Sequence, residues 1–249
     1  MFNLIKAEFY QLKVRLSPKI WLLMSILISM AIVIVPYLFE NNFSGTGGIP
    51  SYFLAQAYAE FATSMAVYFL LGLTLTTFNN DIKHRTIVNS ASIGYSRTKI
   101  YFSKFISSLT FALIFLALSF LTFALVIQFF YPTDFSSLVD MIVVDKFLAY
   151  LPIWLAYLAL YIAILFVSDG TMPITVLMII LIMSPLFLNL ASYASEWIKA
   201  IRPYVLTELN PDVALSVFGI ENASYIITFI YFIVFTFVGL TLFKRKEIK

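Results

Sequence analysis

Six long hydrophobic stretches, five of them without charge, dominate the pattern along the chain and are separated by polar segments. The first is Ile20–Phe39, whose 20 residues would form a helix long enough to cross about 30 Å of hydrocarbon. Its length and its Val-Pro-Tyr-Leu-Phe ending favour a membrane span over a signal peptide. The same reading predicts five further spans, of which the second contains Glu60: Tyr52–Phe78, Phe105–Phe130, Phe147–Ser168, Pro173–Tyr193 and Ala223–Phe243. The pattern therefore predicts an all-α, polytopic membrane fold in which residues 1–249 form one domain.

The segments between the spans differ in what they predict. Asp169–Met172 is short and contains a glycine, which indicates a tight hairpin between the fourth and fifth spans. Tyr131–Lys146 carries three Asp but also several aliphatic residues, and we expect a short structured cap there. Ala194–Asn222 places Trp197, Ile198 and Ile201 at helical spacing, so it forms either short helices at the outer interface or an ordinary connecting loop.

An amphipathic helix is predicted at the N-terminus, over about residues 1–18. Its apolar stripe has members three or four residues apart: Phe2, Ile5, Phe9, Leu12 and Leu16. Three basic residues surround the stripe, and Ser17-Pro18 is expected to end the helix. Such a helix lies in the membrane interface, either as a topological anchor alone or with a further role.

The distribution of Lys and Arg predicts the orientation. Of the 16 basic residues, 13 lie in the N-terminal segment, in Asn79–Lys104 or after Phe243, all on one side of a six-span topology. The opposite side has three basic and eight acidic residues. By the positive-inside rule, both termini are cytoplasmic. We therefore expect a multi-pass protein of the plasma membrane.

Composition limits the chemistry. With 61% hydrophobic and only 12% charged residues, the chain needs lipid as solvent for much of its surface. The absence of Cys excludes disulfides and thiol catalysis, and a single His leaves no His-based metal site. No glycine precedes a lysine as in a phosphate-binding loop, and no hydrolase motif is present. We expect no catalytic residue, cofactor or metal in this chain and no nucleic-acid partner.

The Asn79–Lys104 loop has signals of local structure. A short helix over roughly His84–Ser92 should end at Gly94, and Ser96 is placed to cap the next helix. The loop also carries several basic residues, among them Lys83, Arg85 and Arg97. Charge alone favours a loop that only fixes the topology.

The opening Leu4–Lys13 and the loop elements Thr86–Asn89 and Gly94–Lys99, followed by Lys104, resemble the membrane subunits of ABC-2 type transporters. The resemblance is closest to small six-span permeases of lantibiotic-immunity, bacitracin-resistance and peptide-toxin export systems. In that family, the N-terminal helix is an interfacial elbow and the first cytoplasmic loop is a coupling helix that docks on a separate ATPase. Arg85 stands where the family usually has Gly before the Thr-Ile pair.

The resemblance implies a permease subunit of an ATP-driven exporter of hydrophobic or amphipathic peptides, working with a second identical or homologous permease. ATP and Mg²⁺ would be bound by the cytoplasmic partner subunit. It assigns ATPase coupling to Asp81, Lys83, His84, Arg85, Thr86, Ile87, Asn89, Gly94, Ser96 and Arg97. The alternative is a membrane-embedded enzyme or a sensor scaffold that transports nothing.

Glu60 is the one charged residue within a predicted span. Ionisable groups inside a membrane are candidates for function, so Glu60 could line a translocation pathway. Because Phe61–Asn80 is itself a run of 20 uncharged residues, Glu60 could instead mark the outer interface.

Overall fold

The computed structural model describes residues 2–42, 49–83, 86–131, 133–167, 172–211 and 223–245, and these contain helices and no strand. Four elements cover the chain up to residue 92: α1 (Phe2–Val14), α2 (Leu16–Asn42), α3 (Ser51–Lys83) and α4 (Thr86–Ser92). The central part comprises α5 (Arg97–Phe130), α6 (Phe135–Leu138), the π-helical segment η1 (Val139–Leu148) and α7 (Ala149–Val167). The last part comprises α8 (Met172–Ala194), α9 (Glu196–Ile201), the 3₁₀ turn η2 (Arg202–Tyr204) and α10 (Ala223–Arg245).

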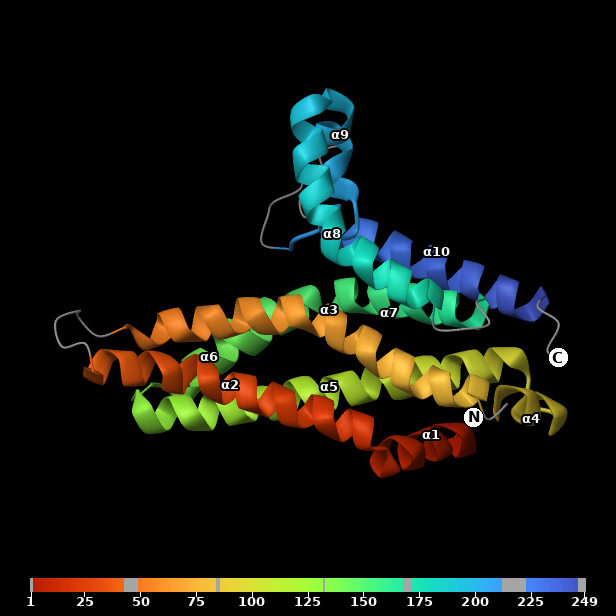
Figure 1. The fold of residues 1–249 in the computed structure, drawn as a ribbon, viewed down its shortest axis with the longest axis horizontal. Helices are drawn as coiled ribbons and strands as arrows, with labels where there is room; N and C mark the ends of the chain where they lie inside the picture. Colours follow the sequence, from red (N-terminus) through yellow and green to blue (C-terminus); the bar gives the residue numbers. More distant parts are fainter. Residues whose placement is uncertain are drawn as a thin grey trace.

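Six helical stretches are long and apolar enough to cross a membrane, which confirms the all-α polytopic fold. Their bounds are Leu16–Glu40, Ser51–Leu75, Arg97–Phe130, Phe135–Val167, Thr175–Tyr193 and Ala223–Arg245. In Figure 1, α1 begins and α10 ends at the end of the bundle that carries α4, as an even number of spans requires. We call this the α4 end. The predicted hairpin over residues 169–171 lies outside the described residues.

The fourth span begins earlier than the sequence indicated. The cap expected over Tyr131–Lys146 is instead mostly the start of one continuous helical rod, formed by α6, η1 and α7. Asp134 begins this rod as an N-cap whose carboxylate accepts hydrogen bonds from Ser136, and these bonds lower the pKa of Asp134. Leu138, Ile142 and Phe147 are buried along one side, so packing against the bundle extends the helix.

The predicted end of the N-terminal helix was also wrong. The helix ends at Val14, and Ser17 and Pro18 belong to the first turn of α2. Proline is accepted there because the first N–H groups of a helix have no partner within the helix. The buried residues of α1 are Glu8 and Leu12, whereas Phe2 of the predicted apolar stripe is 88% exposed.

The core of the bundle is centred on α7. This helix is apolar on all sides, and α3, α5 and α10 pack around it. Its contact with α10 is the most extensive between two helices among the described elements, and the two backbones approach closely at Gly239 and Ala163. By contrast, α8 leaves most of its described side chains exposed, and its far half stands away from the bundle together with α9 (Figure 1). α8 contains Pro185 in its interior, and proline is a usual cause of a helix kink.

Two helices are longer than a bilayer requires. The 33 residues of α3 and the 34 of α5 correspond to about 50 Å each, against a hydrocarbon core of about 30 Å. Near the start of α2, Trp21 packs against Phe69 with ring centroids 5.5 Å apart. About the last two and a half turns of α3 therefore continue beyond the start of α2. The short helix α4 contacts α3, and α1 packs mainly against α5.

Candidate functional site

The short helix α4 ends where its sequence predicted, at Ser92 before Gly94, whereas its predicted start at His84 lies outside the described residues. Gly94 adopts a positive φ of 96°, a conformation that favours glycine and ends the helix. Ser96 then caps α5, its hydroxyl accepting a hydrogen bond from the Lys99 backbone N–H. Gly94 and Ser96 therefore end α4 on its C-terminal side, and the chain reverses there into the first turn of α5.

The residues assigned to coupling gather at this end. Asp81 and Lys83 lie in the last turn of α3, while Thr86, Ile87 and Asn89 belong to α4. His84 and Arg85 lie outside the described residues. After α4, Ile93 is 77% exposed, so an apolar side chain points away from the bundle. The α4 end thus offers a small exposed surface beside a helix whose C-terminal end is fixed by Gly94 and Ser96.

Arg97 does not extend freely from this surface as its place in the loop had suggested. Its guanidinium donates hydrogen bonds to the carbonyl oxygens of Phe243 (2.9 Å) and Lys244 (2.6 Å) at the end of α10. It also lies 5.9 Å from the centroid of the Phe243 ring. A cation bound to the last carbonyl groups of a helix stabilises that terminus. Arg97 therefore joins the α4–α5 turn to the last spanning helix.

Lys104 makes a second connection, to α1 and α3. Its ammonium group lies 2.5 Å from the Glu8 carboxylate and 5.5 Å from the centroid of the Phe78 ring. The side chains of Lys104 and Glu8 are only 4% and 11% exposed. Sequence reasoning had counted Lys104 as a basic residue of the loop, but the structure buries it in an ion pair. Through Arg97 and Lys104, the first turns of α5 contact α1, α3 and α10.

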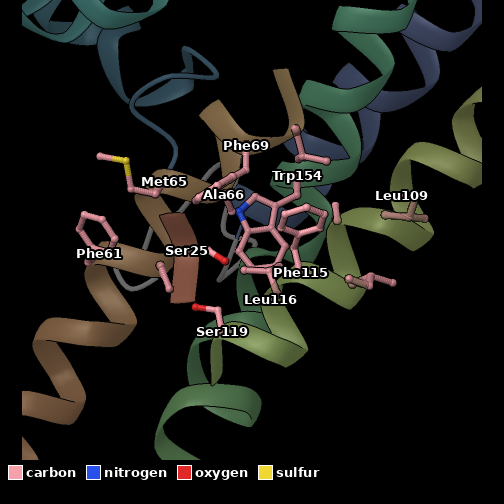
Figure 2. Close-up of a pocket in the computed structure, with 14 residues that line it drawn as sticks. Ser25, Phe61, Met65, Ala66, Phe69, Leu109, Phe115, Leu116, Ser119 and Trp154 are labelled. Atoms are coloured by element: carbon pink, nitrogen blue, oxygen red, sulfur yellow. The ribbon is translucent and has the colours of Figure 1, made fainter. Parts of the chain in front are cut away.

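A polar cluster joins three helices within the bundle. The hydroxyl of Ser119 on α5 lies 2.7 Å from that of Ser29 on α2 and 2.9 Å from that of Tyr58 on α3. Beside the cluster, a narrow apolar cleft is lined by residues of α2, α3, α5 and α7. Figure 2 shows the Trp154 indole among its lining residues, with the hydroxyl groups of Ser25 and Ser119 beside it. These hydrogen bonds fix the packing of the three helices in surroundings without water.

A much larger cavity, of about 670 Å³, opens between α3, α7, α8 and the segment after α9. This volume is in the range of about 300–1,000 Å³ that is usual for ligand pockets. Aliphatic residues of α7 and α8 form one part of its lining, and polar groups form the rest: Thr63, Ser64, Tyr68, Tyr150, Tyr157, Asn189, Arg202, Thr207, Glu208 and Asn210. The lining suits a molecule that has both an apolar and a polar part.

The polar wall of this cavity is held by hydrogen bonds. The Arg202 guanidinium donates to Glu208 at 2.9 Å and to Asn189 at 3.1 Å. The Tyr150 hydroxyl donates to the side-chain carbonyl of Asn210 at 2.8 Å, which anchors the segment after α9 to the helical rod that contains α7. Sequence reasoning missed this site because its residues come from four separate segments. The available signal was the group of polar residues between Pro203 and Pro211, within the stretch where only short helices or a loop were expected.

Glu60 lies close to this cavity. It is exposed on α3, where it accepts a hydrogen bond from Gln56 at 3.1 Å, one turn before Ser64 of the cavity lining. Tyr58, two residues earlier, is level with Ser29 because both bind Ser119, and Ser29 is near the middle of α2. Glu60 is therefore one turn from the cavity lining and level with the middle of α2.

Comparison with known proteins leaves the site to be interpreted from its own geometry. No family model, no curated protein and no solved structure matches this chain. Among the described residues, no three His, Asp or Glu side chains lie close enough together to hold a metal ion. The two features that a function must explain are the linked helix ends around α4 and the amphipathic cavity beside α8.

Proposed function

We propose that this chain is the membrane-spanning permease subunit of an ATP-driven exporter of hydrophobic or amphipathic peptides. ATP would be hydrolysed by a separate cytoplasmic subunit that docks on α4, and a second permease subunit, identical or homologous, would complete the transporter. In this proposal the chain lies in the plasma membrane with both termini in the cytoplasm, so the α4 end faces the ATPase.

The observation that carries the proposal is the set of connections at the α4–α5 turn. Arg97 binds the end of α10, while Lys104 binds Glu8 of α1 and lies near Phe78 of α3. A force applied to α4 would therefore reach three other helices through short, directional contacts. Rigid helices linked in this way can rock between two states, as transport by alternating access requires.

The cavity supports the substrate class. Its aliphatic wall on α7 and α8 could receive the apolar side of a peptide, and its polar wall around Arg202 could receive the polar side. Because α8 contacts α7 only sparsely, the wall that it forms could move without disrupting the core. Glu60, one turn from the cavity lining, is the candidate pathway residue on α3.

The test is co-purification followed by ATP hydrolysis in proteoliposomes. The tagged chain is expressed in its native host, and a co-purifying protein is identified by mass spectrometry and by photolabelling with an azido-ATP analogue. Ile93→Glu should remove this partner and the peptide-stimulated hydrolysis, because a charge at the exposed tip after α4 disrupts an apolar contact. Trp197→Glu is the matched control, since Trp197 is 80% exposed on α9, away from the α4 end.

A chain that is active without any ATP-binding partner would refute the permease proposal and favour the membrane-embedded enzyme. Loss of the partner in both variants would refute the docking role of α4. The substrate part is tested separately with Ser64→Trp, which fills the cavity from an exposed position on α3. It should lower peptide transport and retain the ATPase, whereas full transport would exclude this cavity as the substrate site.

A further inference from the structure

A second cleft lies at the membrane surface between α1, α2 and α5. Its volume is about 520 Å³, and its floor is apolar, formed by Leu12, Leu22, Phe111, Ile114 and Phe115. Three lysines stand around it: Lys6 and Lys13 on α1, and Lys19 on α2. An apolar floor beneath several cationic groups fits an anionic amphiphile better than water or a free ion.

The three lysines have no counter-charge among the described residues. All are exposed, and none forms an ion pair there, whereas Glu8, the acidic residue of α1, is engaged by Lys104. Lys6 and Lys13 are seven residues apart and so lie on one side of α1, about 10 Å from each other along the helix. Three uncompensated positive charges around one cleft repel each other, and an anion placed among them relieves this repulsion.

The cleft is at the depth of a lipid headgroup. Lys19 directly precedes Ile20–Phe39, the first uncharged run, so it stands where α2 enters the hydrocarbon. Phe9 packs against Phe111 with ring centroids 5.5 Å apart, which brings α1 alongside α5 at the same level. A phosphate placed among the lysines would leave the apolar floor open to an acyl chain that points into the bilayer.

We propose that this cleft binds one anionic phospholipid of the inner leaflet. Its phosphate group would lie among Lys6, Lys13 and Lys19, and one acyl chain would lie along the floor. The bound lipid holds α1 against α2 and α5, where protein contacts alone leave a gap. This inference takes the cytoplasmic orientation from the proposed function but does not depend on transport, because it concerns only the α1 side of the bundle.

The expected preference follows from the three charges. A basic residue near a membrane surface contributes about a fivefold preference for anionic lipid. Replacing three lysines with glutamine should therefore reduce the preference of the cleft for phosphatidylglycerol over phosphatidylcholine by about a hundredfold.

The full chain is reconstituted in nanodiscs of phosphatidylcholine with a minor fraction of phosphatidylglycerol, then analysed for retained lipid by native mass spectrometry. The wild-type chain should retain one phosphatidylglycerol, and the variant K6Q/K13Q/K19Q should not. The control K99Q/K244Q/R245Q removes the same charge from exposed positions at the same end and should retain the lipid. Ile114→Trp, which fills the cleft and keeps every charge, should also release it.

Several results would overturn the proposal. They are equal retention of phosphatidylcholine, loss of the lipid in the control triple variant, or retention after Ile114→Trp. Displacement by millimolar inorganic phosphate would show that the site binds a free anion and not a lipid. Circular dichroism and elution as a single species establish that each variant is folded, so that loss of lipid reports on the cleft.

Discussion

The ion pair between Lys104 and Glu8 allows a quantitative prediction. Replacing Lys104 with Met keeps much of the apolar stem but leaves the Glu8 carboxylate buried without its cationic partner. Breaking a buried ion pair on one side costs about 3–5 kcal/mol, mainly because the remaining charge is desolvated. The lost contact between Lys104 and the Phe78 ring belongs to the same perturbation.

The assay is thermal unfolding in mild detergent, measured as the fraction of the chain that still elutes as a single species after heating. With about 2–4 °C per kcal/mol for a chain of this length, Lys104→Met should lower the midpoint by about 6–20 °C. The double variant E8L/K104M should recover most of this loss, because it leaves no buried charge unpaired. Lys99→Met, an exposed lysine on the same helix, is the control and should change little.

The reasoning would be refuted by a small effect of Lys104→Met, or by a double variant as unstable as the sum of the two single changes. The first result would mean that water or lipid headgroups reach the pair. The second would mean that the residues act through separate contacts and not through each other.

Other predictions address packing, topology and pH. Gly239→Ala should destabilise by about 1–3 kcal/mol, since its new Cβ would lie 2.7 Å from the Ala163 Cβ, and Ala163→Gly in the same chain should restore part of the loss in thermal unfolding. Because the chain lacks Cys, single cysteines can be labelled without background: Ser136→Cys should react with a membrane-impermeant maleimide in whole cells and Ser92→Cys should not, and the reverse would invert the orientation. Partial burial and a hydrogen bond to the Glu40 carboxylate raise the pKa of Tyr131 to about 12. The contribution of Tyr131 to stability should therefore be complete below pH 10 and be lost as the pH rises through 12. Tyr131→Phe should not show this change in thermal unfolding.

Features fixed by neighbouring residues could be predicted from the sequence. The number of spans follows from uncharged runs, and the end of α4 follows from Gly94 and Ser96, whose conformation and capping bond are local. Pro18 was misassigned because proline both follows helix ends and occupies first turns, and only packing decides between the two. The sequence placed the start of the fourth span too late, because Asp140 and Lys146 interrupt the run of uncharged residues there. Neighbouring residues of the same helix are nevertheless buried against the bundle.

The sites depend on residues that are distant in sequence. Lys104 and Glu8 are separated in sequence by α2, α3 and α4, so nothing near Lys104 signals that it is buried. Arg97 meets its partners only where the chain ends. The cavity beside α8 combines α3, α7 and the segment around Arg202, and no periodicity within one helix reveals such a juxtaposition.

The contact between α7 and α10 has a consequence for biogenesis. Because α10 follows the other five spans in the sequence, these spans have already left the ribosome before the most extensive helix contact among the described elements can form. Until then, the side of α7 that contains Ala163 can face only lipid or a membrane chaperone. A chain truncated before Ala223 should insert and still be degraded, because the exposed helix is the central one. Quality control of this protein is therefore expected to be decided by the synthesis of α10.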